Sequence, residues 1–97
     1  MKLLIAAISL TLAACASNIT LTSDEFDSGV RRGRVEGLVD ESTSIVNTRL
    51  DCRSGPGQYA VVSYSYGGSP NLRANVIVPA KSLKRGDETK VNIRGCQ

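Results

Sequence analysis

Two neighbouring segments of this chain alternate between apolar and polar residues, and this pattern constrains the fold more than any other feature. In residues 58–66 the positions expected on the buried face are Ala60, Val62, Tyr64 and Tyr66. In residues 71–78 they are Leu72, Ala74, Val76 and Val78. A side-chain period of two is typical of a half-buried strand, and the intervening Gly-Gly-Ser-Pro segment is typical of a turn. The two segments are therefore predicted to form an antiparallel hairpin.

Shorter alternating segments flank this hairpin. Residues 34–39, 44–52 and 88–94 are further predicted strands, and Gly37 inside the first indicates a bulge. Four or five short strands at this spacing predict a mainly β domain, a small antiparallel sheet curled into an SH3-like or OB-like barrel. A flat meander capped by a helix is the alternative.

A short helix is predicted before the first strand, over residues 23–32. Thr22 and Glu25 have the spacing of a capping box, and Phe26 and Val30 would share one helix face. Gly33 is expected to end the helix. Because Phe26 is the only phenylalanine in the chain, we expect it to close one end of the core.

Residues 1–14 begin with one basic residue, Lys2, and continue as an almost unbroken apolar run. The run is too short for a membrane-spanning helix, which needs about 20 apolar residues, and it fits the core of a signal peptide. The Leu-Ala-Ala-Cys motif that ends at Cys15 resembles the lipobox of bacterial lipoproteins. The resemblance implies cleavage before Cys15 and acylation of this cysteine, with palmitate among the acyl groups. An ordinary secreted protein without acylation is the alternative.

This interpretation divides the chain into a signal peptide (1–14), a lipidated cysteine with its tether (15–22) and a periplasmic β domain (23–97). Residue 16 is Ala and not Asp. By resemblance to the sorted lipoproteins of bacteria with two membranes, this residue implies transport to the periplasmic face of the outer membrane.

Cys52 and Cys96 are the two cysteines that remain for the folded domain. In an oxidising periplasm two cysteines most simply pair. Closing the long loop between them would stabilise the domain by about 4 kcal/mol. Two free thiols or a metal site are the alternatives. The chain has no histidine and no CxxC motif, which argues against zinc, and no cofactor is expected.

The sequence lacks the residues of common catalytic sites. Without histidine there is no imidazole base for a serine or cysteine nucleophile. Asp40 and Glu41 are adjacent, so on a strand they would point to opposite faces, whereas paired-carboxylate hydrolysis needs them to converge. We therefore expect a protein that is not an enzyme and has no catalytic residue.

Charge is unevenly distributed, with the acids concentrated in residues 24–51 and the bases in residues 52–97. The cations expected to bind a partner are Arg73, Lys84, Arg85, Lys90 and Arg94. If strands 71–78 and 88–94 are neighbours, these cations form one basic surface; an ordinary solvated face is the alternative. A second recognition-like set, for which ordinary strand packing is the alternative, is Tyr59, Tyr64 and Tyr66.

These features predict a non-enzymatic, membrane-anchored lipoprotein that binds an envelope component and serves envelope integrity or assembly. The expected partner is an envelope protein or lipopolysaccharide, not nucleic acid. The β part is similar to that of small glycine-zipper outer-membrane lipoproteins, although the zipper is missing. The layout of Cys15, Cys52 and Cys96 also resembles small phage-encoded superinfection-exclusion lipoproteins, which block an outer-membrane receptor from the periplasmic side. A structural subunit of a secretion or conjugation complex is a third alternative.

Overall fold

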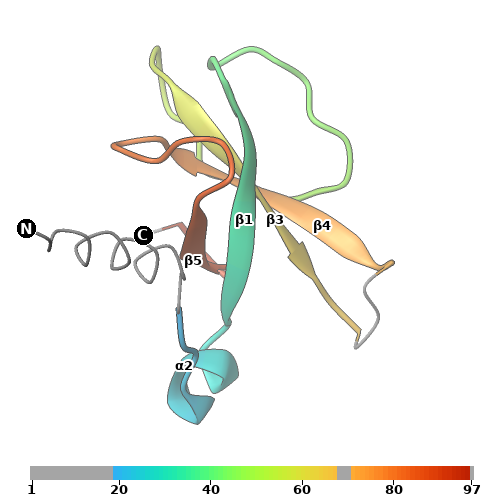
Figure 1. Cartoon of the computed structure of the whole chain (residues 1–97). Helices are drawn as coiled ribbons and strands as arrows, with labels where there is room; N and C mark the ends of the chain where they lie inside the picture. The colour runs from blue at the N-terminus through green and yellow to red at the C-terminus, as the bar shows by residue number, and fades with distance from the viewer. Residues whose placement is uncertain (1–18, 68–70, 97) are drawn as a thin grey trace, which may run out of the picture.

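The computed structural model describes residues 19–67 and 71–96 (Figure 1). The predicted signal peptide and lipobox, with Cys15, lie outside these described residues. The elements are α2 (Ser23–Asp27), β1 (Val30–Val39), β2 (Thr48–Asp51), β3 (Tyr59–Ser65), β4 (Arg73–Pro79) and β5 (Glu88–Asn92). Within the described ranges, no helix is long and apolar enough to cross a membrane.

The five strands form one mixed sheet in the order β2-β4-β3-β1-β5. The predicted central hairpin is confirmed: β3 pairs antiparallel with β4, and Val62 lies opposite Val76. β1 pairs antiparallel with both β3 and β5. The prediction of a wholly antiparallel sheet is wrong at β2, which runs parallel to β4. The loop 40–47 carries the chain from the end of β1 to the far edge of the sheet, so β2 starts there in the same direction as β4.

Both faces of the sheet are buried along part of its length. The inner face, as we call it, carries the larger cluster: Val35, Ala60, Val62, Tyr64, Val76, Ala80 and Val91. The outer face carries Tyr59, Val61 and Ile77, packed against Val39 and Ile45. Six of the seven residues of β3 are therefore buried, because it is the central strand and is covered on both sides. The predicted inward positions are correct for Ala60 and Val62, but the outward positions are buried too.

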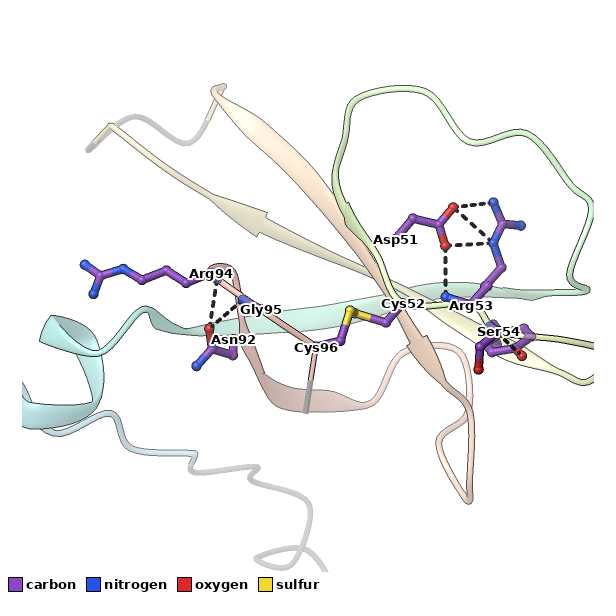
Figure 2. The surroundings of a disulfide bond; sticks show 9 residues. Asp51, Cys52, Arg53, Ser54, Asn92, Arg94, Gly95 and Cys96 are labelled. Carbon is purple, nitrogen blue, oxygen red and sulfur yellow. Dashed lines mark hydrogen bonds and ion pairs between the residues drawn. A yellow bond between two sulfur atoms is a disulfide. The ribbon is translucent and has the colours of Figure 1, made fainter.

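The disulfide predicted between Cys52 and Cys96 is present in the structure (Figure 2). It joins the end of β2 to the segment after β5, and these are the two edge strands of the sheet. Asn92 reverses the chain towards Cys52, because its Oδ1 accepts hydrogen bonds from the backbone N–H groups of Arg94 and Gly95 (2.8 and 3.3 Å). The sheet is curled but not closed, since β2 and β5 form no ladder with each other. The predicted barrel is therefore not confirmed.

The predicted helix exists but is much shorter than expected. Its capping box is confirmed: the Thr22 hydroxyl accepts from the Glu25 N–H (3.1 Å), and the Glu25 carboxylate accepts from the Thr22 N–H (3.0 Å). The chain leaves the helix through Gly29, whose φ of +95° favours glycine. Gly33 is therefore not the helix stop and lies inside β1.

The prediction that Phe26 closes the core is wrong, because the side chain is 51% exposed. The early end of the helix places Val30 in β1, so the two residues no longer share a helical face. The guanidinium carbon of Arg31 instead lies 3.7 Å from the centre of the Phe26 ring.

All five strand predictions need correction at their ends. The first strand begins at Val30 and not at residue 34, and the last ends at Asn92 and not at residue 94. The strand predicted over 44–52 begins only at Thr48, because Asn47 has a φ of +55° and Val46 is 78% exposed. Tyr66 and Leu72 are also exposed, since the hairpin ladder ends before them. The bulge predicted at Gly37 is confirmed by a register shift between Val35 and Gly37.

Candidate functional site

The sheet order spreads out the cations that were predicted to bind a partner. β4 and β5 are not neighbours, because β3 and β1 lie between them, so the condition for one basic surface is not met. Lys84 and Arg85 lie in the loop 80–87, which contacts β1 through the hydrogen bond from Gly86 N–H to the Val35 carbonyl (2.8 Å). Arg94 lies at the opposite end of β1, beside Gly29.

Two of these cations are already engaged within the fold. The Lys90 ammonium lies 2.9 Å from both carboxylate oxygens of Glu25 and ties α2 to β5. This hydrogen-bonded lysine is the main cause that lowers the pKa of Glu25. The Arg73 Nε donates a hydrogen bond to the Ser63 hydroxyl on the outer face (2.8 Å).

The three tyrosines occupy very different surroundings. Tyr59 is structural, because its hydroxyl donates to the Gly55 carbonyl (2.7 Å) and accepts from the Ser54 N–H (3.2 Å). Tyr64 is only 2% exposed, whereas Tyr66 is 46% exposed. The rings of Tyr64 and Tyr66 lie 6.4 Å apart, and both border an open groove.

This inner groove, as we name it, is a hollow of about 620 Å³ near α2, at the border of the sheet between the start of β2 and the hairpin end of β3 and β4. Its aromatic lining residues are Phe26, Tyr64 and Tyr66, and its cationic ones are Arg31, Arg49 and Arg73. Ala74 and Ile93 add apolar surface. Among its described lining residues there is no aspartate or glutamate. The groove therefore combines aromatic surface with positive charge.

Five parts of the fold converge on the groove. Phe26 comes from α2, Arg31 from β1, Tyr64 from β3, Arg73 from β4, and Arg49 from β2. The start of β2 is held against β4 by Asn75, whose backbone N–H donates to the Asn47 carbonyl (2.9 Å) and whose side chain donates to the Val46 carbonyl (3.0 Å). β2 and β5 are the two edge strands of the curled sheet and form no ladder with each other (Figure 1).

Arg31 is fixed in place at one end of the groove. Its Nη1 donates to the backbone carbonyls of Phe26 and Val30 (3.0 and 2.9 Å), and its guanidinium stacks on the Phe26 ring. Stacking on an aromatic face stabilises a cation without neutralising it. Arg31 therefore keeps its full charge next to the groove.

Tyr64 is the most buried residue that borders the groove, and its hydroxyl is a candidate ligand contact. The hydroxyl makes no hydrogen bond with any residue in the described part of the chain. Every fully buried side-chain oxygen or nitrogen there does have a partner. The hydroxyl must therefore reach the groove surface, where it can donate to a ligand.

The tether approaches the groove from the side of α2. Arg32 Nη1 donates to the Ile19 carbonyl (2.9 Å), and a second hollow of about 530 Å³ lies between this segment and the Phe26–Arg31 pair. The groove is therefore at the end of the domain where the described chain begins.

Comparison of the chain with models of known protein families, with curated proteins and with solved structures finds no match. Within residues 19–67 and 71–96, no three side chains of the metal-ligating types come together.

Sequence reasoning placed Tyr64, Tyr66 and Arg73 in recognition sets but missed Phe26, Arg31 and Arg49. Phe26 and Arg31 fall in the helix predicted over residues 23–32, and Arg49 falls in the strand predicted over residues 44–52. Their spacing in the sequence could not predict that these three residues line one groove. Their proximity depends on the early end of α2 and on the position of β2 at the edge of the sheet.

Proposed function

We propose that this protein is a non-enzymatic, lipid-anchored periplasmic binding protein that holds part of another envelope component in the inner groove. The observation that carries the proposal is the lining of this groove, with three arginines, three aromatic rings and no carboxylate in the described part of the chain. Aromatic and arginine side chains are the types that contribute most to protein interfaces.

The position of the tether supports an envelope partner. Cleavage and acylation at Cys15 would leave at most about 14 Å of extended chain between the lipid and Ile19, whose carbonyl is bound by Arg32. The groove would then be held next to the membrane. Components within reach are periplasmic segments of membrane proteins and the membrane itself.

Site-specific photocrosslinking in living cells tests this proposal. A benzophenone amino acid replaces Tyr66 at the groove rim, and a matched control carries it in place of the exposed Lys84 in the loop 80–87. We expect an adduct of one discrete size from position 66 only, lost when Arg49→Gln and Arg73→Gln are added. Equal adducts from both positions would contradict the proposal. An adduct from position 66 that persists when both arginines are substituted would contradict it too.

The anchor is tested separately with Cys15→Ser in the full chain. The variant is expected to lose acylation and to leave the outer-membrane fraction, while its folded domain keeps the same melting temperature. Unchanged mass and fractionation would reject the lipoprotein assignment, although they would leave the groove as a binding site.

Superinfection exclusion is a second candidate, and the pairing of Cys52 with Cys96 favours it because this pairing fits the layout of such lipoproteins. Cells that produce the protein are challenged with phages that use different outer-membrane receptors. Protection should extend only to phages that share one receptor, and Cys15→Ser should abolish it. Equal plaque numbers with every phage would remove this candidate.

A further inference from the structure

We infer that the inner groove takes an acidic, extended peptide segment, with one carboxylate bound by the Tyr64 hydroxyl and by groove arginines. This inference rests on the proposed function and names the class of partner at the same groove. Three features support it: a tyrosine hydroxyl at the groove surface with no protein partner among the described residues, uncompensated positive charge and an open strand edge.

The first feature is the Tyr64 hydroxyl. The residue is 2% exposed and its hydroxyl has no partner among the described residues. In the free protein the hydroxyl reaches the surface and can bond to water, but a partner that covers it would leave an unpaired donor, which is costly. The partner must therefore project an acceptor into the hollow. A carboxylate on a side chain can do this, whereas the phosphates of a flat bilayer stay at the rim.

The second feature is the charge balance of the groove. Three cations outside the groove pair with acids: Arg34 with Glu88 (3.6 Å), Arg53 with Asp51 (2.7 Å) and Lys90 with Glu25 (2.9 Å). The groove arginines have no such partner there, and Arg49 makes no hydrogen bond or ion pair to a described residue. The planar guanidinium fits a carboxylate through two parallel hydrogen bonds. An acidic ligand therefore supplies the missing charge.

The third feature is the open edge of β4. Asn75 and Ile77 direct backbone groups towards β2, since the Asn75 N–H donates to the Asn47 carbonyl and the Ile77 carbonyl accepts from the Cys52 N–H. By strand alternation, Arg73 directs its backbone groups to the same side. The ladder with β2 starts only at Thr48 opposite Asn75, so the edge at Arg73 is open. An incoming extended segment can pair there, as in other complexes formed by strand addition.

The aromatic residues of the groove indicate which side chains of the bound peptide lie next to its carboxylate. Phe26 and Tyr66 are about half exposed at the groove, which leaves apolar surface for the neighbouring side chains of the segment. A volume of about 620 Å³ lies in the usual range for small bound groups, roughly 300–1,000 Å³. The groove therefore accommodates a few side chains of an extended peptide rather than a folded domain.

The test measures binding of a fluorescein-labelled peptide, Glu-Val-Glu-Phe-Glu-Val, to the acylated protein by fluorescence anisotropy. The protein is reconstituted through its anchor into vesicles of neutral phosphatidylcholine. A matched peptide has glutamine in place of each glutamate. We expect saturable binding of the acidic peptide and at least about tenfold weaker binding of the neutral one, because hydrogen bonds to charged groups are lost.

Variants locate the binding within the groove. Tyr64→Phe keeps the ring and removes only the hydroxyl, and Arg49→Gln removes one charge at a position with no internal partner. Each is expected to weaken binding of the acidic peptide by about tenfold, with an unchanged melting temperature. The control variant, with Lys84→Gln and Arg85→Gln in the loop 80–87, should bind within about twofold of the wild type.

Two outcomes would overturn the inference. The first is equal binding of the acidic and neutral peptides, or binding that Tyr64→Phe and Arg49→Gln leave unchanged. The second is binding that disappears when phosphatidylglycerol is added to the vesicles, which would assign the groove to lipid phosphates instead. If the photocrosslink from position 66 persists in cells while the acidic peptide fails to bind, only the partner class is wrong and the proposed function stands.

Discussion

Arg49 lies near the start of β2 and Arg53 just after its end, yet the Arg53 side chain has an acid and two carbonyls as partners, whereas the Arg49 side chain has no partner in the described chain. Arg53 binds the Asp51 carboxylate through Nε and Nη2 (3.0 and 2.7 Å). Its Nη1 donates to the carbonyls of Thr43 and Asp40 (2.7 and 3.1 Å). Arg49 lines the inner groove without a hydrogen bond or an ion pair to a described residue.

The difference separates a region built for stability from one available for binding. Arg53 fastens the loop 40–47 to the end of β2, and the carboxylate beside it raises the pKa of its guanidinium. Among the described residues, the three groove arginines have no acid partner and the Tyr64 hydroxyl has no protein acceptor. At functional sites, proteins tend to leave polar and charged side chains without partners inside the fold.

The largest expected effect comes from the disulfide that joins the two edges of the sheet. With Cys52→Ser and Cys96→Ser together, we expect the free energy of unfolding to fall by about 2–5 kcal/mol. The bond closes a sequence separation of 44 residues, and a domain of this size has little stability to spare. Urea unfolding of the oxidised wild type, the reduced wild type and the variant measures the change. Coincident curves for the oxidised protein and the variant would show that the disulfide adds nothing.

The comparison between the two arginines is tested most directly by matched substitutions. Arg53→Gln removes the partner of Asp51 and leaves the Asp40 and Thr43 carbonyls without a charged donor, so the melting temperature should fall by several degrees. Arg49→Gln should leave it unchanged at about 0.15 M salt. Thermal unfolding followed by circular dichroism decides between them. Equal melting temperatures for the two variants would show that Arg53 does not stabilise the fold more than Arg49 does.

A pH titration examines the stable region on its own. Asp40 accepts hydrogen bonds from the backbone N–H and hydroxyl groups of Ser42 and Thr43, and these bonds, the Ser42 N–H first, lower its pKa from 3.8 to about 2. Because the pKa is lower in the folded state, the carboxylate stabilises the fold above about pH 4, and this contribution is lost as the pH falls towards 2.

Asp40→Asn should therefore make the melting temperature depend less on pH between about 5 and 2. Some dependence should remain, because Arg53 also lowers the pKa of Asp51 and Lys90 that of Glu25. Groove variants such as Arg49→Gln serve as controls and should keep the slope of the wild type. An unchanged slope in Asp40→Asn would show that the turn does not depend on this carboxylate.

The features that could be predicted from the sequence are those fixed by nearby residues or by strong pair constraints. The hairpin follows from alternation around one turn, the capping box from the spacing of Thr22 and Glu25, and the disulfide from the cysteine count. The helix length was wrong because Gly29, and not Gly33, takes the positive φ. The residue pattern of the predicted helix did not show whether Gly29 or Gly33 would turn the chain.

The groove could not be predicted, because it depends on tertiary contacts. Tyr59 and Tyr64 occur in the same alternating strand, but the loop 53–57 satisfies the hydroxyl of Tyr59 and nothing in the described chain satisfies that of Tyr64. β2 runs parallel to β4 and so brings Arg49 to the groove. This direction follows from the path of the loop 40–47. Local propensity carries no information about either arrangement.

The smallest expected effect concerns the mutual repulsion of the groove arginines. Because Arg31, Arg49 and Arg73 line one hollow with no described acid among them, Arg49→Gln should relieve repulsion and raise the melting temperature by about one degree at low salt. At 0.01 M ionic strength charges interact over about 30 Å, and at 1 M over about 3 Å. The gain should therefore disappear as salt is added, whereas the loss caused by Arg53→Gln should persist, because its hydrogen bonds do not depend on long-range attraction. A lower melting temperature for Arg49→Gln at low salt would mean that Arg49 has an acid partner in the folded protein, and the contrast with Arg53 would then fail.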